Sequence, residues 1–406
     1  MRSRANGQAI AAAPPSSSSA SPSSFWLVAG LLLVAANLRA PITGVAPVLE
    51  TIRAAFGLSP AQAGLLTTLP LLAFGLLSPF AALLARRVGL ERSLFGALLF
   101  VGAGIALRSG GSAACLYLGT AVIGAGIAVG NVLMPGLVKR DFPARVPAVT
   151  GLCAIAMGGV AALASGSAVP MANALGWRAA LGAGIVFPLL ALAFWGMRLR
   201  RAPPGAGTAA APQRGGVWRS ALAWQVTLFM GTNSLLYYVL VGWLPSMLAA
   251  AGFAPGHAGS VHGVMQLATA LPGLVLGPVV GRLKDQRLLA AGMGLLMAAA
   301  LLGLLLAPGW AWLWAFALGI GSGGGVLLAL MFMGLRSGSA HQAAALSGMA
   351  QCVGYLLAAS GPALAGMLRE SSGGWDAPLG VGVALAGAMT VFGALAGRAR
   401  TLGAPH

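Results

Sequence analysis

The amino-acid sequence predicts an all-α polytopic membrane protein with twelve transmembrane helices in two parallel six-helix repeats. Three observations predict this class: the composition, the number of long apolar stretches, and a motif that recurs about half a chain later. Hydrophobic residues make up 58% of the 406 residues and charged residues only 7%, whereas charged residues make up about 25% of a soluble domain. The formal charge of +18 lies mainly in loops and tails outside the apolar stretches, so nucleic-acid binding is not predicted.

Twelve apolar stretches are long enough to cross a bilayer, which takes about 20 helical residues. They cover residues 25–49, 61–85, 93–111, 113–138, 148–172, 177–197, 220–250, 257–281, 288–307, 310–335, 343–368 and 377–397. The basic, proline- and glycine-rich segment 198–219 predicts a flexible linker between bundles at 25–197 and 220–397. Residues 1–24, rich in serine, alanine and proline, predict a disordered tail, and residues 398–406 form a second tail.

The distribution of positive charge predicts the orientation of these stretches. The loops on the side of the termini, together with the tails, carry 19 of the 24 lysines and arginines. The loops on the other side carry four, namely Arg53, Arg108, Arg178 and Arg369. Because positively charged loops stay on the inner side of a membrane, both tails and the linker are predicted to be cytoplasmic.

A motif at the entrance to the sixth apolar stretch recurs at the entrance to the twelfth. Four of the six residues in Gly176-Trp177-Arg178-Ala179-Ala180-Leu181 are repeated in Gly374-Trp375-Asp376-Ala377-Pro378-Leu379. Weaker matches occur elsewhere at nearly the same shift. The two sets of six are therefore interpreted as parallel repeats, an arrangement that places a substrate site near the bilayer midplane between them.

The first apolar stretch contains the main candidate site, formed by Asn37, Arg39 and Pro41. At a rise of about 1.5 Å per residue, Arg39 lies beyond the middle of the hydrocarbon core. A charged residue at that depth usually faces the protein interior or a wet cavity. Pro41 removes a backbone donor, so we expect the helix to bend or open beside Arg39. The alternative is that a neighbouring helix neutralises Arg39, which then only fixes packing.

The surroundings of Arg39 limit the class of solute. All six acidic residues lie in loops or at the ends of apolar stretches, so no carboxylate is expected at the depth of Arg39. A small anion could supply the missing charge, whereas a cation would be repelled. The alternative is a neutral polar aromatic solute, held by Arg39 and by the rings of Tyr237, Tyr238 and Trp243.

Other polar residues within the apolar stretches are candidates for the same cavity. They are Asn131, Asn233, His262, Gln266, Gln351 and Tyr355. The pairs His262 with Gln266 and Gln351 with Tyr355 are each four residues apart and share a helix face. These residues could instead only form hydrogen bonds between helices. Since histidine binds a proton near neutral pH, His262 is the candidate for proton coupling, with facilitated diffusion or exchange as the alternative.

The loop after the eighth stretch, Gly281-Arg282-Leu283-Lys284-Asp285-Gln286-Arg287, resembles the signature loop of the major facilitator superfamily. A carboxylate near a helix N-terminus can latch the two halves and then release them. In the first half Arg86, followed by Arg87, stands where the signature has its aspartate, so Glu91 or Asp141 would have to substitute. The alternative is that these loops are solvated and only set the topology.

Several motifs together resemble one family within that superfamily. They are Asn37-Leu38-Arg39-Ala40-Pro41, Leu66-Thr67-Thr68-Leu69-Pro70, Lys139-Arg140-Asp141-Phe142-Pro143, the run from Trp224 to Gly231, Tyr238, and Trp243-Leu244-Pro245. They resemble the cyanate and 2-nitroimidazole transporter family. The resemblance implies an inner-membrane carrier for a small solute, and we expect a monomer that works by alternating access.

No group of residues typical of an enzyme active site is visible at membrane depth. A membrane enzyme and a receptor are therefore less favoured than a carrier. Cys115, Cys153 and Cys352 lack metal-ligand spacing, so neither a metal nor a cofactor is predicted. The glycine clusters at 124–126 and 321–325 lie inside apolar stretches. They predict close helix packing rather than phosphate-binding loops.

Overall fold

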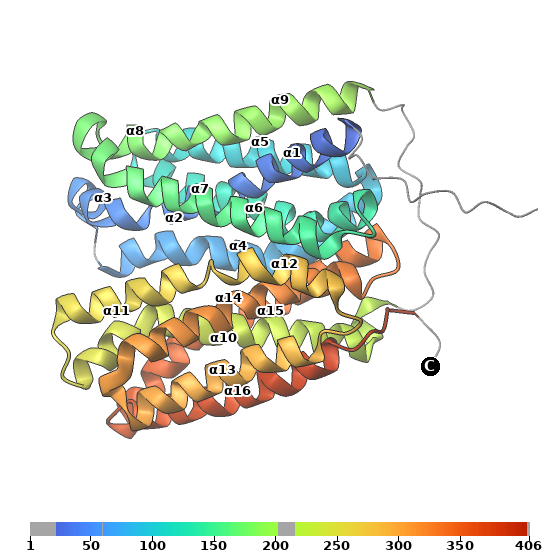
Figure 1. Cartoon of the computed structure of the whole chain (residues 1–406). Helices are drawn as coiled ribbons and strands as arrows, with labels where there is room; N and C mark the ends of the chain where they lie inside the picture. The colour runs from blue at the N-terminus through green and yellow to red at the C-terminus, as the bar shows by residue number, and fades with distance from the viewer. Residues whose placement is uncertain (1–21, 59, 202–215, 404–406) are drawn as a thin grey trace, which may run out of the picture.

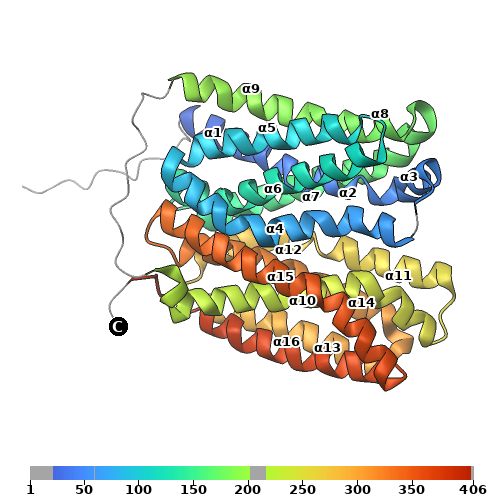
Figure 2. The ribbon, with the colours of Figure 1, turned by 180° about the vertical axis from the view of Figure 1, so that it is seen from behind.

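The computed structural model describes residues 22–58, 60–201 and 216–403, and these form two helical bundles that pack against each other (Figures 1 and 2). Twelve segments of the described chain are long and apolar enough to cross a membrane, as the sequence predicts. Helix α1 starts, and α16 ends, at the same end of the molecule (Figure 1). We call this end, which carries Pro22, Arg201, Ala221 and Ala396, the base, and the opposite end the mouth.

The first half contains the helices that provide the first six spans. They are α1 (Pro22–Asn37), α2 (Ala40–Thr43), the 3-10 turn η1 (Ala46–Val48), α3 (Leu49–Phe56), α4 (Pro60–Val88), α5 (Leu90–Arg108), α6 (Ala113–Asp141), α7 (Val146–Leu175), α8 (Trp177–Gly182), η2 (Ala183–Ile185) and α9 (Val186–Arg201). The first span is broken between α1 and α2, as the position of Pro41 predicts.

The second half provides the other six spans in the same order. Its elements are η3 (Val217–Arg219), α10 (Ala221–Ala250), α11 (Pro255–Ala268), α12 (Pro272–Arg282), α13 (Arg287–Leu306), η4 (Pro308–Trp310), α14 (Ala311–Leu335), α15 (Ala340–Ser372) and α16 (Asp376–Ala396). The eighth span was predicted as one continuous helix, but it is broken between α11 and α12. Pro272 has no amide hydrogen, so the carbonyl of Ala268 loses its regular helical donor there.

The ends of the predicted segments differ slightly from the observed helices. Helix α1 begins at Pro22, inside the tail predicted for residues 1–24, because proline is well tolerated in the first turn of a helix. Helix α9 extends to Arg201, and η3 occupies 217–219, so the ends of the predicted linker are helical. The remainder of that linker, 202–215, and residues 1–21 lie outside the described residues.

The recurring motif occupies equivalent places in the two halves. Trp177 begins α8, Trp375 immediately precedes α16, and both indole side chains are buried. An arginine guanidinium stacks on each ring, Arg178 on Trp177 at 5.5 Å and Arg369 on Trp375 at 4.9 Å. The motif therefore marks corresponding positions near the mouth.

Glycines allow the helices to approach closely. A Cβ atom at Gly119 of α6 would overlap the backbone of Arg108 in α5. Similarly, a Cβ at Gly323 of α14 would overlap the carbonyl of Thr269, at the break between α11 and α12. Small residues at such positions are typical of membrane helix pairs. The prediction that the glycine cluster at 321–325 packs helices is confirmed.

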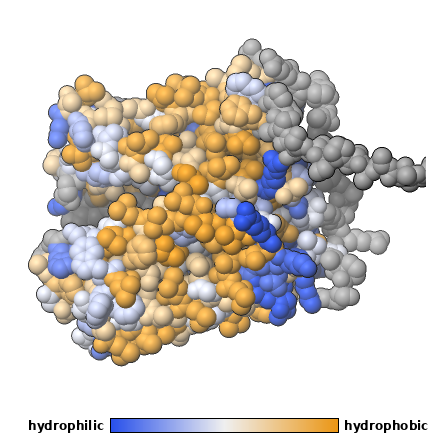
Figure 3. All heavy atoms as spheres, viewed as in Figure 1, coloured by the Kyte–Doolittle hydropathy of each residue, from blue (hydrophilic) through white to orange (hydrophobic). Residues whose placement is uncertain are grey.

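The two halves touch each other toward the base. Gly348 of α15 packs against Ser78 of α4, and Gly151 of α7 packs against Gly277 of α12. Each of these residues lies in the part of its helix nearer the base. Toward the mouth, the surface is indented between the halves, while apolar side chains cover much of the flank (Figure 3). Among the described residues, these glycine contacts between the halves therefore lie toward the base, whereas Arg39, nearer the mouth, is exposed.

Candidate functional site

The break between α1 and α2 presents Arg39. Pro41 cannot donate to the carbonyl of Asn37, and Arg39 itself has backbone angles of φ −134° and ψ −41°. The side-chain amide of Asn37 donates to the carbonyl of Leu33 at 2.7 Å. Its Oδ1 is buried and has no partner among the described residues. Asn37 therefore stabilises the last turn of α1 and leaves one buried acceptor at the break.

The side chain of Arg39 is exposed although its neighbours are buried. Leu38 is 4% exposed and Ala40 is 6% exposed, and both pack into the first half. A charged group at this depth usually faces a water-filled cavity rather than lipid, so we interpret the exposed guanidinium as lying in such a cavity. Within the described part of the chain, no carboxylate forms an ion pair with it.

Tyrosines from the second half lie opposite Arg39. Arg39 lies within electrostatic range of the hydroxyl groups of Tyr238 in α10 and Tyr355 in α15. Arg39, Tyr238 and Tyr355 each lie about four to five helical turns from the base. The ring of Tyr238 packs edge-on against Tyr237 at 5.2 Å, and Tyr355 contacts Phe74 of α4 at 5.0 Å. The candidate site therefore combines one cation from the first half with aromatic rings from the second.

Tyr237 connects this aromatic group to α11. The hydroxyl of Tyr237 donates to Oε1 of Gln266 at 3.2 Å. His262 lies one turn earlier on the same helix, and its Nε2 is buried with no partner among the described residues. The structure thus brings Tyr237 and Gln266 together. The role of His262 in proton coupling stays a prediction.

Gln351 joins the site region to the contact between the halves. Its Nε2 donates to the hydroxyl of Ser347 at 2.8 Å, and that hydroxyl is 3.5 Å from the carbonyl of Asn131 in α6. The Oε1 atom of Gln351 is buried without a partner among the described residues. Gln351 and Asn131 therefore lie where the two halves meet below Tyr355, on the side of the base.

Two of the predicted site residues join the packing of the second half instead. Asn233 is 2% exposed and donates to the carbonyl of Ser322 in α14 at 3.1 Å. Trp243 donates to the carbonyl of Pro362 at 2.8 Å and packs against Trp375 at 5.3 Å. Because each donates to a backbone carbonyl of a neighbouring helix, the structure places both side chains in the packing of the second half, and their role in binding stays a prediction. Polar groups buried in a membrane protein often serve such pairing.

A second arginine near the break was not predicted as a site residue. Arg108 was assigned to a loop, but it forms the last residue of α5 and is only 2% exposed. Its Nη1 donates to the carbonyl of Pro41 at 2.6 Å, and its Nε has no partner among the described residues. The position of Arg108 at the end of an apolar stretch is the usual sequence pattern of a solvated loop, so only the fold reveals its burial.

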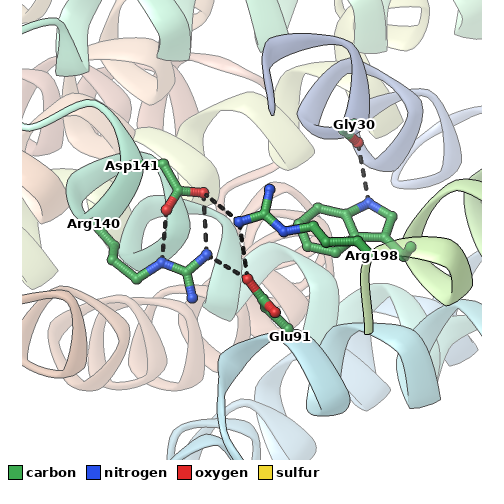
Figure 4. Close-up of polar contacts among 6 residues, drawn as sticks. Gly30, Glu91, Arg140, Asp141 and Arg198 are labelled. Atoms are coloured by element: carbon green, nitrogen blue, oxygen red, sulfur yellow. Dashed lines mark hydrogen bonds and ion pairs between the residues drawn. The ribbon is translucent and has the colours of Figure 1, made fainter. Parts of the chain in front are cut away.

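At the base, charged side chains join helices of the first half (Figure 4). Arg140 of α6 contacts Asp141 at 2.7 Å and Glu91 of α5 at 2.8 Å. Arg198 of α9 contacts Glu91 at 3.0 Å and stacks over Trp195 at 5.2 Å. We call Glu91, Arg140, Asp141 and Arg198 the basal ion cluster. It ties α5, α6 and α9 together inside one half.

The predicted latch between the halves is not formed in this conformation. Asp285 is 3.4 Å from Arg287 on its own loop, and both side chains are about half exposed. Glu91 and Asp141, proposed as substitutes in the first half, bind arginines of that half. Arg86, Arg87, Gly281 and Arg282 are exposed at the base. Within the described residues, the contacts that close the base are instead those of small residues such as Gly348 and Gly151.

Comparisons with known proteins agree with this architecture. The family model of the Major Facilitator Superfamily matches residues 25–362. The chain is 52% identical over 375 residues to the 2-nitroimidazole transporter of Escherichia coli (strain K12), covering 92% of this chain and 95% of that protein. It is 30% identical over 355 residues to the cyanate transport protein CynX of the same organism, covering 85% and 90%.

A solved structure shows the same fold at low sequence identity. The E. coli fucose:proton symporter FucP superposes with a TM-score of 0.72 and 13% identity, covering 92% of this chain and 98% of that chain. The expected arrangement of twelve membrane helices in two six-helix repeats is thereby confirmed. The relatives are transporters and not enzymes.

Proposed function

The chain belongs to the major facilitator superfamily, and from that premise we propose that it carries a small planar solute across the bacterial inner membrane by alternating access. The observation that carries this proposal is the exposed Arg39 at a helix break, within electrostatic range of tyrosines of the other half. A site made by both halves is disassembled and rebuilt when they rock about it, as alternating access requires. The base, where α1 starts and α16 ends, faces the cytoplasm in this proposal.

The first candidate solute is a heteroaromatic such as a nitroimidazole. A planar guanidinium can donate two parallel hydrogen bonds to the two oxygens of a nitro group, as it does to a carboxylate. Tyr237, Tyr238 and Tyr355 offer ring faces and edges to an aromatic solute. The 52% identity to a 2-nitroimidazole transporter supports this choice over the small anion that the sequence favoured.

A small anion such as cyanate is the second candidate. It is favoured by the charge of Arg39, for which the described residues supply no carboxylate partner. A fixed cation in a site of low dielectric constant attracts an anion strongly. The 30% identity to a cyanate transport protein is consistent with this alternative.

Uptake into liposomes that contain the purified protein tests both candidates. We expect labelled 2-nitroimidazole to enter faster than cyanate, and unlabelled 2-nitroimidazole to compete with it. Arg39→Ala should reduce uptake to the background of empty liposomes, because the solute loses its charged partner. Arg39→Lys should restore only part of the rate, since lysine lacks the planar donor fork.

The matched control is Arg400→Ala, which removes an exposed arginine beyond α16. It should transport at the wild-type rate. Size-exclusion chromatography must show that all variants remain folded and monodisperse. Wild-type uptake by folded Arg39→Ala would remove Arg39 from the site, and faster uptake of cyanate would reverse the order of the two solutes.

A further inference from the structure

The carbonyl of Pro41 lacks its regular helical partner. In an α-helix this carbonyl would accept from the amide of Val45, four residues later. The amide of Val45 instead donates to the carbonyl of Ile42 at 3.2 Å. The carbonyl of Pro41 accepts from Nη1 of Arg108 at 2.6 Å. A side chain from α5 therefore replaces the missing backbone donor.

This hydrogen bond is buried and comes from a charged donor. Arg108 is 2% exposed, and its backbone is pressed against α6 at Gly119. Within the described residues, no carboxylate forms an ion pair with it. Hydrogen bonds with an ionised donor are shorter and stronger than neutral ones. Because no carboxylate neutralises the guanidinium, the burial of this charge needs another explanation.

The segment that follows Arg39 is held from two sides. On one side Arg108 of α5 binds the carbonyl of Pro41. On the other side the hydroxyl of Thr43 is 3.4 Å from the carbonyl of Ala161 in α7. The second contact is long for a hydroxyl donor and belongs to a neutral group. Arg108 therefore supplies the stronger of the two anchors for α2.

We propose that Arg108 is a positioning residue that keeps the first span open, so that Arg39 faces the tyrosines of the second half. Without the guanidinium, the carbonyl of Pro41 has no partner, and the amide of Val45 is free to return to it. That change closes the turn between α2 and η1 and frees α2 from α5. Because Arg39 is the N-cap of α2, its side chain then moves away from the tyrosines together with α2.

Thiol labelling at position 39 tests this inference without any substrate. Arg39→Cys is introduced into a background in which Cys115, Cys153 and Cys352 are replaced by serine or alanine. Purified protein in detergent is labelled with a neutral maleimide, and the rate is compared in variants of Arg108. Arg108→Met and Arg108→Leu remove the donor, whereas Arg108→Gln removes the charge but keeps an amide donor. Because no solute is involved, the result is independent of the proposed function.

We expect labelling to slow at least tenfold in Arg108→Met and Arg108→Leu and to stay within about threefold of the parent in Arg108→Gln. The matched control is Arg178→Met, because Arg178 also donates to a backbone carbonyl, that of Gly111 at 3.1 Å, but is exposed and binds a residue outside the first span. It should label at the parent rate.

Three outcomes would overturn the inference. Parent-like labelling in all Arg108 variants would show that the break holds without the anchor. Equal slowing in Arg108→Met and Arg108→Gln would show that the charge, and not the hydrogen bond, affects the thiol. Loss of folded protein in both Arg108→Met and Arg108→Leu would assign Arg108 to folding instead.

With Arg39 intact, the same inference has a second readout in transport. Misplacing Arg39 weakens its contact with the solute, so folded Arg108→Met should show a raised KM. A merely structural role would lower the amount of active protein and leave KM unchanged.

Discussion

The two halves join their helices at the base in different ways. In the first half, two arginines and two acids form the basal ion cluster, and their side chains are 9% to 35% exposed. In the second half, a single arginine after α14, Arg336, occupies the corresponding place and is 4% exposed. Both arrangements tie together the starts or ends of three helices.

Arg336 uses neutral acceptors. Its Nε donates to the carbonyl of Ala396 at 2.9 Å, and its Nη2 donates to the carbonyl of Gly397 at 3.0 Å and to Oε1 of Gln286. The guanidinium also lies over the ring of Phe332 at 4.9 Å. Burial lowers the pKa of Arg336 to about 10, while the carboxylate of Asp285 acts in the opposite direction. The group therefore remains charged at neutral pH.

The difference concerns which half can rearrange. Partly exposed ion pairs contribute about 0 to 1 kcal/mol each and exchange partners readily. A buried guanidinium with several hydrogen bonds leaves unpaired groups behind if it moves, and each costs about 1 to 3 kcal/mol. We therefore expect the base of the second half to stay rigid during transport. The base of the first half is the one that can loosen.

The largest expected effect is that of Arg336→Met. The substitution keeps an unbranched chain but removes the guanidinium donor from the carbonyl of Ala396 and from Oε1 of Gln286, while the carbonyl of Gly397 keeps only the amide of Gln286. We expect the free energy of unfolding in detergent micelles to fall by about 3 kcal/mol. Arg282→Met, which removes an exposed arginine at the same end, is the matched control and should change it by less than about 0.5 kcal/mol. An equal, small loss in both variants would remove the contrast between the halves.

A smaller effect is expected from Glu91→Gln. This change removes the carboxylate that links Arg140 of α6 to Arg198 of α9. We expect a loss of about 1 kcal/mol in the free energy of unfolding at low salt, because both partners are partly exposed. The loss should shrink at 1 M salt, where the Debye length is only about 3 Å.

The two bases should differ in how the loss in the free energy of unfolding depends on salt. The loss in Arg336→Met should be nearly the same at both salt concentrations, since its hydrogen bonds are buried. A loss in Glu91→Gln that equals that of Arg336→Met, or that does not respond to salt, would contradict the distinction.

The sequence predicted those features that depend on nearby residues. Twelve spans follow from apolar length, and a break beside Arg39 is expected from Pro41, because a proline removes a specific hydrogen bond. The repeat placed Trp177 and Trp375 at equivalent positions, as the structure has them. The second break also has a local cause, Pro272, but its surroundings lack a charged residue that would have drawn attention to it.

Features that depend on contacts between distant segments were missed. Arg108 reaches Pro41 across 67 residues, and Asn233 reaches Ser322 across 89. In both cases the acceptor is a backbone carbonyl and not a side chain. Every residue has such a group, so the sequence offers no sign of which one is used. The pairing of Asp285 within its own loop was missed because the resemblance pointed to a contact between the halves.

The smallest expected effect is that of Asp285→Asn, a substitution that tests the base of the second half directly. If that base is held by Arg336 and its neutral acceptors, the exposed pair of Asp285 with Arg287 at 3.4 Å contributes little. We expect the free energy of unfolding to change by less than about 0.5 kcal/mol. We also expect single cysteines introduced at the base and at the mouth to react with a thiol reagent at parental rates. A severalfold change in their relative rates would show that Asp285 latches the halves in the other conformation. Such a result would show that the base of the second half rearranges as readily as that of the first.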